Sequence, residues 1–96
     1  MASVTRSSEL LKVDGIVGFT TSLALASEVF RASCQVVRGS VKVSIRPDRT
    51  AEFDVQRGQT FYVTGAPDMR DFRASPAPTS QVIPLIAVNY EGHGGA

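Results

Sequence analysis

The sequence predicts an all-β fold, a small single-domain sandwich or barrel, and three observations support it. Short segments alternate between apolar and polar side chains, as strands with one buried face do. Glycine and proline separate these segments at intervals of about ten residues, which is typical of turns between short strands. The chain has 96 residues, of which 43% are hydrophobic, and this is enough for one modest core. We therefore expect one domain, spanning residues 9–91.

The N-terminal part begins with a small and polar segment, residues 1–8, which we expect to form a flexible arm. After it, the pair Asp14-Gly15 separates the apolar segments LLKV and IVGFTT and predicts a hairpin. Residues 22–31 leave two interpretations open. Their apolar side chains fit one face of a short helix that Ser22 would cap, whereas the neighbouring strands favour an extended segment.

Residues 41–63 carry the most regular strand pattern of the chain. Apolar and polar side chains alternate along successive segments, so that each strand has one apolar and one solvated face. The apolar faces are expected to form the core. It would include Val41, Val43, Ile45, Phe53, Val55, Phe61 and Val63.

The register of the first hairpin in this region follows from matching the apolar faces. Val43 should lie opposite Phe53, because a slip of one residue would turn every side chain to the other face. The same register places Lys42 opposite Asp54 and leaves the loop Pro47-Asp48-Arg49. It also pairs Ile45 with Ala51.

The next turn contains Gly58 and allows two arrangements. A hairpin would pair Val55 with Gln59 and Phe53 with Phe61, with Gly58 in the left-handed conformation that closes the loop. A corner between two packed sheets would use the same Gly58.

The C-terminal part predicts two further strands, at residues 69–74 and 81–91, separated by the proline-rich segment SPAPTS. Pro84 within the second of these indicates an edge position, a bulge or the start of the strand. Residues 92–96 are mostly glycine and are expected to form a flexible tail.

The net charge of +1 gives no broad basic surface, which argues against nucleic acid and anionic membranes as partners. The aromatic and basic residues nearest to a nucleic-acid pattern are Phe61, Tyr62, Arg70, Phe72 and Arg73, and the two phenylalanines are expected in the core. The N-terminus lacks the apolar run of a signal peptide, and the apolar stretch IPLIAV is too short to span a bilayer. We expect a soluble protein made in a cytoplasm.

The residues that could support catalysis or metal binding are isolated. Cys34 is the single cysteine and is expected to be a buried, inert thiol, while His93 is the single histidine and lies in the glycine-rich tail. Glu52 and Asp54 share the solvated face of a strand, where cross-strand ion pairs are the expected role. These observations predict a protein with no cofactor, no metal and no enzymatic activity.

A mixed charge pattern lies at residues 68–73. Asp68 and Asp71 alternate there with Arg70 and Arg73, which is typical of a solvated strand or loop rather than a catalytic pocket. No serine nucleophile motif and no phosphate-binding glycine loop occurs in the sequence.

The segments VVRGSVKVSI and EFDVQRGQTFYVTG resemble the strand-glycine-strand rhythm of cupin-like jelly rolls, over about half of the chain. In the catalytic cupins, the corresponding strands carry several histidines and a glutamate that bind a metal, and these histidines are absent here. The resemblance therefore implies a jelly-roll-like fold without cupin metal chemistry.

In size and pattern the chain is also similar to small structural proteins of tailed-phage virions, notably the β-sandwich decoration or cement proteins of capsids. This resemblance implies a non-enzymatic virion protein that forms a homo-oligomer, for example a trimer, and binds a major capsid protein or another virion protein. The segments 1–8 and 92–96 would then add contacts to neighbours. The alternative is a metal-free cupin-like module that binds a small ligand or sugar, which would need inward polar groups where the sequence places Val, Ile, Phe and Ala.

Overall fold

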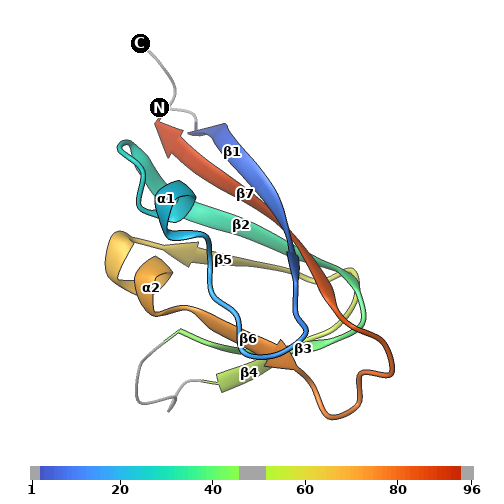
Figure 1. Cartoon of the computed structure of the whole chain (residues 1–96). Coiled ribbons are helices and arrows are strands. Elements are labelled where there is room, and N and C mark those ends of the chain that lie inside the picture. Colours follow the sequence, from blue (N-terminus) through green and yellow to red (C-terminus); the bar gives the residue numbers. More distant parts are fainter. Residues whose placement is uncertain (1–2, 46–51, 94–96) are drawn as a thin grey trace.

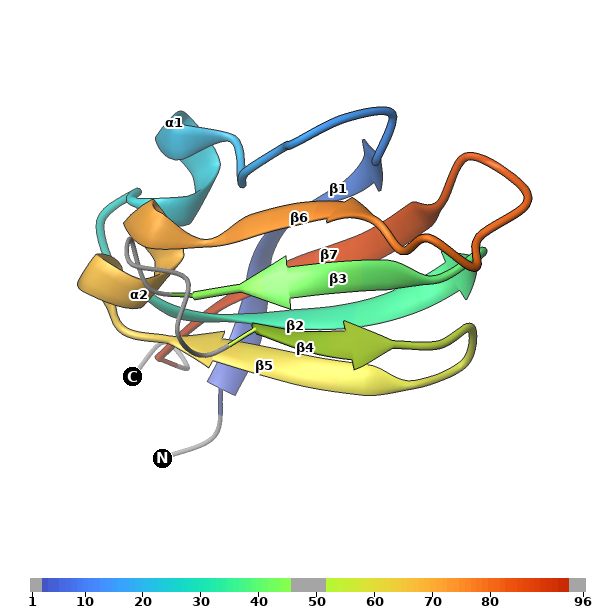
Figure 2. The same ribbon diagram turned by 90° about the horizontal axis from the view of Figure 1, so that it is seen from below.

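Two antiparallel sheets form the protein in the computed structural model, which describes residues 3–45 and 52–93 (Figure 1). The four-stranded sheet has the order β1-β7-β2-β5 and the three-stranded sheet the order β4-β3-β6. Seen from below, the three-stranded sheet lies over the four-stranded one (Figure 2). The elements are β1 (Ser3–Lys12), α1 (Thr21–Ala24), β2 (Val29–Arg38), β3 (Val41–Ser44), β4 (Glu52–Val55), β5 (Thr60–Thr64), α2 (Ala66–Asp71), β6 (Arg73–Pro76) and β7 (Leu85–His93). The predicted all-β, sandwich-like fold is confirmed.

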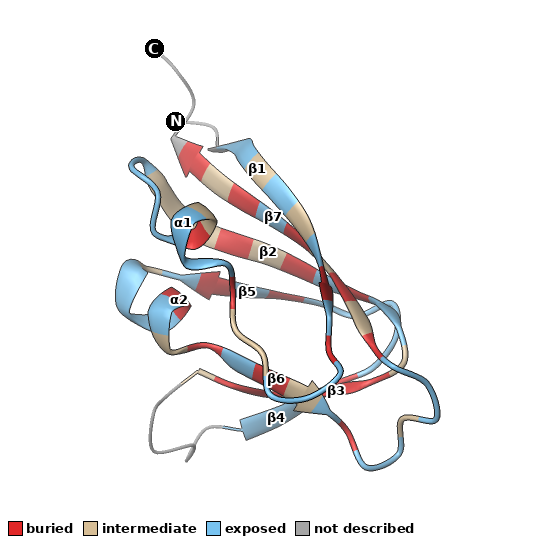
Figure 3. Cartoon of the chain, viewed as in Figure 1, coloured by how far each residue is buried: buried red, intermediate tan, exposed pale blue. Residues whose placement is uncertain are grey.

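The core lies between the facing sides of the two sheets, and buried residues alternate with less buried ones along β2 and β7 (Figure 3). Five of the predicted core residues are buried, namely Val41, Val43, Val55, Phe61 and Val63. Ile45 is partly buried and packs against this cluster. Phe53 was wrongly placed in the core, because its side chain is 38% exposed on β4, an edge strand of the three-stranded sheet.

The predicted register of β3 and β4 is confirmed. Val43 lies opposite Phe53 and Lys42 lies opposite Asp54. The expected pairing of Ile45 with Ala51 and the loop 47–49 lie outside the described residues.

The turn at Gly58 is a corner between the sheets, and the predicted hairpin of β4 with β5 is wrong. β4 pairs with β3, whereas β5 pairs with β2 in the other sheet. Gly58 has a φ of 90°, and its N–H donates a hydrogen bond of 2.7 Å to the carbonyl of Val36. Because Phe53 and Phe61 face each other across the two sheets, with ring centroids 6.0 Å apart, the side-chain pattern suited both arrangements.

The turn at Asp14-Gly15 also joins the two sheets rather than forming the predicted hairpin. Before it, β1 pairs with β7, and after it Val17 pairs with Ala74 of β6. A turn signal marks a change of direction, and it does not specify whether the chain returns to the same sheet.

Both chain ends extend further into the four-stranded sheet than the sequence predicts. The residues of β1, which include most of the expected arm 1–8, pair with β7 from Ser3 opposite His93 to Lys12 opposite Leu85. Gly92, expected in the flexible tail 92–96, is buried in β7. The expected domain limits at residues 9 and 91 therefore fall inside strands, because main-chain hydrogen bonds pair these strands whatever their side chains.

Residues 22–31 combine the two interpretations that the sequence leaves open. The short helix α1 ends at Ala24, and β2 begins at Val29. The N-cap residue of α1 is Thr20 rather than Ser22, and no side-chain hydrogen bond caps the helix.

The strand predicted at residues 69–74 begins as a helix instead. α2 starts behind Gly65, whose φ of 90° turns the chain, and Pro67 lies in its first turn, where the missing N–H is no loss. Only Arg73 and Ala74 of the predicted segment belong to a strand, β6. Pro84 directly precedes β7, which is the strand-start position that the sequence allowed.

Candidate functional site

A pocket of about 360 Å³ lies at one end of the sandwich, between the two short helices. Figures 1 and 2 both show α1 and α2 at this end of the molecule, where the two helices contact each other. The segment that leads into α1 forms one wall, and the end of α2 with the start of β6 forms the other. The lining residues are Gly18, Phe19, Thr21, Ala24, Leu25, Met69, Arg70 and Arg73.

The floor of the pocket is apolar and rigid. Phe19, Ala24 and Met69 are all buried. The Phe19 ring stacks on the ring of Phe72 with centroids 4.0 Å apart, and it meets the edge of Tyr90 at 5.6 Å. The floor is therefore continuous with the core, so that its position is fixed by packing.

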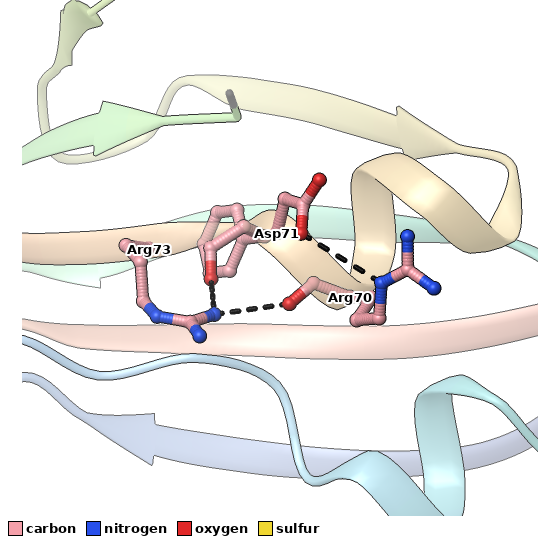
Figure 4. Close-up of polar contacts among 4 residues, drawn as sticks. Arg70, Asp71 and Arg73 are labelled. Carbon is pink, nitrogen blue, oxygen red and sulfur yellow. Dashed lines mark hydrogen bonds and ion pairs between the residues drawn. The ribbon is translucent and has the colours of Figure 1, made fainter. Parts of the chain in front are cut away.

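Two arginines stand at the rim. The Nη1 of Arg73 donates hydrogen bonds to the carbonyls of Phe72, at 2.6 Å, and of Arg70, at 3.1 Å (Figure 4). These carbonyls lie at the C-terminal end of α2, where backbone oxygens have no partner within the helix. The Nε of Arg70 lies 3.7 Å from Oδ1 of Asp71 (Figure 4). The end of α2 thus fixes Arg73 at one nitrogen and pairs Arg70 with a neighbouring carboxylate.

Gly18 leaves room for the Arg73 guanidinium. A Cβ atom at this position would lie 2.9 Å from Nη1 of Arg73 and 3.1 Å from the carbonyl oxygen of Phe72. Since both distances are shorter than normal contacts, a larger residue would displace the guanidinium or the wall.

Polar contacts hold the segment before α1, which forms one wall of the pocket. The carboxylate of Glu9 accepts hydrogen bonds from the Thr20 hydroxyl, at 2.7 Å, from the Thr20 N–H, at 3.2 Å, and from the Tyr90 hydroxyl. Burial and the neighbouring Glu9 carboxylate raise the pKa of Tyr90, so that its hydroxyl stays a donor. β1 and β7 thereby position the pocket wall.

A second surface feature is the free edge of the four-stranded sheet. β1 is outermost in this sheet, and its register with β7 shifts between Thr5 and Ser7 and is regular from Ser7 to Lys12. On the outer face beside it, Leu10 is 59% exposed and lies opposite the half-buried Ala87. We call the edge 7–12 and its apolar neighbours the β1 surface; those neighbours are Leu10, Val37, Leu85 and Ala87.

The other predicted residues lie outside the lining of the pocket. Cys34 is fully buried, which raises the pKa of its thiol to about 12, so the expected inert thiol fits the structure. Glu52 and Asp54 are exposed on β4, opposite Ser44 and Lys42, as expected for a solvated face. Of His93 the structure describes only the backbone, at the end of β7.

The nucleic-acid pattern is divided by the fold. Phe61 and Phe72 are buried, as the sequence predicts, and Tyr62 is exposed beneath the guanidinium of Arg31. Arg70 and Arg73 are exposed, as expected of a solvated segment, but Arg70 lies in α2 and Arg73 in β6, and both line the pocket. The sequence contains no signal for this, because the opposite wall comes from Gly18 and α1, far away along the chain.

Within the described residues, no three side chains that could bind a metal lie together, and no helix is long and apolar enough to cross a membrane. Comparisons of the chain with protein-family models, with curated proteins and with solved structures found no match.

Proposed function

We propose that this chain is a non-enzymatic structural module that assembles with copies of itself through the β1 surface. The observation that carries the proposal is the length of the open edge. β1 has ten residues, whereas the other edge strands, β5, β4 and β6, have five, four and four. A long edge offers more unpaired main-chain donors and acceptors to a second strand.

Two copies of β1 can pair through these groups. A two-fold axis places identical strands antiparallel, which extends the sheet across both subunits without any new side-chain complementarity. The bulge between Thr5 and Ser7 would disturb this pairing, but the regular part from Ser7 to Lys12 begins after it.

Exposed apolar side chains beside the edge also favour the β1 surface as the interface. Leu10 and Val37 are 59% and 43% exposed, and the half-buried Leu85 and Ala87 lie between their strands on β7. Burying them would add hydrophobic stabilisation to main-chain pairing, since an edge strand alone is a small interface.

The assembly that the sequence pattern suggests is a tailed-phage particle, with this chain as a capsid decoration protein bound to a major capsid protein or another virion protein. Only the sequence resemblance supports this role on a phage capsid. Pairing of β1 with β1 gives a dimer, whereas pairing of β1 with β5 of the next copy could close a ring such as a trimer. In either arrangement residues 7–12 contribute as a strand rather than as a flexible arm.

The alternative, a cupin-like module with a ligand inside the sandwich, has less support. The described buried side chains are almost all apolar, and the exceptions are Ser40, Ser44, the Cys34 thiol and the Tyr90 hydroxyl, which is bonded to Glu9. A ligand site in this position would need polar groups that point inward.

Light scattering of the intact chain over a range of concentrations tests the proposal. We expect the wild type to form a dimer or a larger closed oligomer, and Leu10→Lys to shift it towards the monomer with an unchanged β-type circular dichroism spectrum. Ile16→Lys is the matched control, because Ile16 is 61% exposed and lies beside the three-stranded sheet, next to Val17, which pairs with Ala74. A monomeric wild type, or equal effects of the two substitutions, would refute assembly through the β1 surface.

A further inference from the structure

We propose that the pocket between α1 and α2 is a binding site for a small organic carboxylate with an apolar body. The site is separate from the β1 surface and does not depend on the proposed assembly. Its volume of about 360 Å³ lies at the lower end of the range for small-molecule sites. The ligand class follows from the charge of the rim and the chemistry of the floor.

The rim is positively charged. Arg70 and Arg73 line the pocket, and no carboxylate is among the lining residues. Asp71 lies next to Arg70 and compensates part of its charge, at a distance of 3.7 Å from Nε. Both arginines are exposed to water, but Arg70 already pairs with Asp71, whereas two backbone carbonyls hold the Arg73 guanidinium, so Arg73 is the principal anchor for an anion.

Arg73 is prepared for a planar anion. Two backbone carbonyls hold Nη1, and within the described residues Nε and Nη2 have no protein partner. A guanidinium whose orientation is already fixed loses little conformational entropy when it binds. Its remaining N–H groups can donate a pair of hydrogen bonds to the two oxygens of a carboxylate.

The apolar side chains of the pocket favour a ligand with an apolar body over a small inorganic anion. Ala24 and Met69 are almost fully buried below the rim, so the apolar surface that a ligand can reach belongs mainly to Leu25, which is 38% exposed, and to Phe19, which is 9% exposed. Inorganic phosphate would contact the rim and leave the floor wet, whereas an aryl or branched alkyl carboxylate would cover both.

Titration of the full chain with benzoate, followed by two-dimensional amide NMR, tests this inference. We expect saturable shifts confined to the segments 18–25 and 69–73. Benzamide has the same shape without the charge and should bind at least about tenfold more weakly, because it lacks the charge-assisted hydrogen bonds. Acetate and inorganic phosphate should also bind more weakly than benzoate, because they do not reach the floor.

Variants distinguish the contribution of each pocket arginine to benzoate binding from the effect of removing any surface charge. Arg73→Gln should weaken benzoate binding about tenfold or more, Arg73→Lys should recover only part of it, and Arg70→Gln should have a smaller effect. Arg57→Gln, an exposed arginine in the turn between β4 and β5, is the matched control and should leave binding unchanged. Gly18→Ala should weaken binding through the displaced guanidinium and does not alter any charge.

Three results would overturn the proposal. These are no saturable shift with benzoate, equal binding of benzoate and benzamide, and unchanged affinity in Arg73→Gln. Phosphate binding as tight as that of benzoate would replace the organic carboxylate with a simple anion as the ligand. Circular dichroism of each variant verifies that a loss of binding is not a loss of fold.

Discussion

The hairpin β3–β4 and the pair β1–β7 are both antiparallel ladders, but they are held in different ways. In the hairpin, Val41 and Val43 of β3 are fully buried, and this alternation fixes the register. In β1, most side chains are exposed or half-buried and only Leu11 among the described side chains is buried. The first pair is specified by side chains and the second mainly by the backbone.

This difference explains which parts of the fold hydrophobic alternation reveals. The alternation of apolar and polar residues shows which side chains face a core, so it predicts the strands that have one buried face. An edge strand can be polar throughout, because its partner needs only main-chain donors and acceptors. A polar segment beside a sheet edge therefore looks like a flexible arm in the sequence.

The largest expected losses of stability come from the contact between β4 and β5, where Phe53 packs against Phe61. Phe61→Ala should lower the free energy of unfolding by about 3–5 kcal/mol, because Phe61 is buried against the Phe72 ring. Phe53→Ala should lower it by only about 1–2 kcal/mol, because more than a third of that ring already contacts water. Urea denaturation of both variants measures the difference. Equal losses would mean that Phe53 is as deeply buried as the sequence predicts.

The next effect concerns the backbone of β7, where the chain end was expected to be a flexible tail. Gly92 lies between β1 and β2, opposite Val4 and Val29, and a Cβ atom there would overlap the carbonyl oxygen of Glu28. Gly92→Ala should therefore destabilise the protein by about 1–3 kcal/mol.

Gly15→Ala is the control for Gly92→Ala. A Cβ atom at Gly15 has no neighbour within 4 Å, so this change should alter stability by less than about 0.5 kcal/mol. Thermal unfolding of both variants under the same conditions provides the comparison. If Gly92→Ala were as harmless as Gly15→Ala, the end of β7 would not be packed as the structure has it.

The sequence predicts the fold class, the buried valines and the β3–β4 register, because each depends on local alternation. It cannot distinguish a hairpin from a corner at Gly58, because Phe53 and Phe61 meet in both arrangements. The pocket is also invisible in the sequence. Its two arginines are ordinary surface residues until α1 and Gly18 are placed against them by the tertiary fold, through hydrogen bonds such as those of Glu9 to Thr20.

The last effect is confined to alkaline pH and comes from the inner face of the four-stranded sheet. Burial raises the pKa of the Cys34 thiol from 9.0 to about 12, so above about pH 9 the unfolded chain releases a proton that the folded chain keeps. The stabilisation from the neutral thiol is fully present below pH 9 and is lost as the pH rises towards 12. The maximal slope is about 1.4 kcal/mol per pH unit. The raised pKa of Tyr90 acts in the same direction from about pH 10, the ordinary value of a tyrosine.

Cys34→Ala isolates the thiol contribution. Urea midpoints of the wild type and of Cys34→Ala, measured with a reductant between pH 7 and pH 11, should differ by a constant packing loss below about pH 9 and should converge above it. The convergence arises because the variant has no thiol to ionise in the unfolded state. Tyr90 contributes similarly to both proteins, because burial and Glu9 raise its pKa more than Cys34 does. Curves that stay parallel up to pH 11 would show that the Cys34 thiol ionises as readily in the folded chain as in the unfolded one, which contradicts its burial between the sheets.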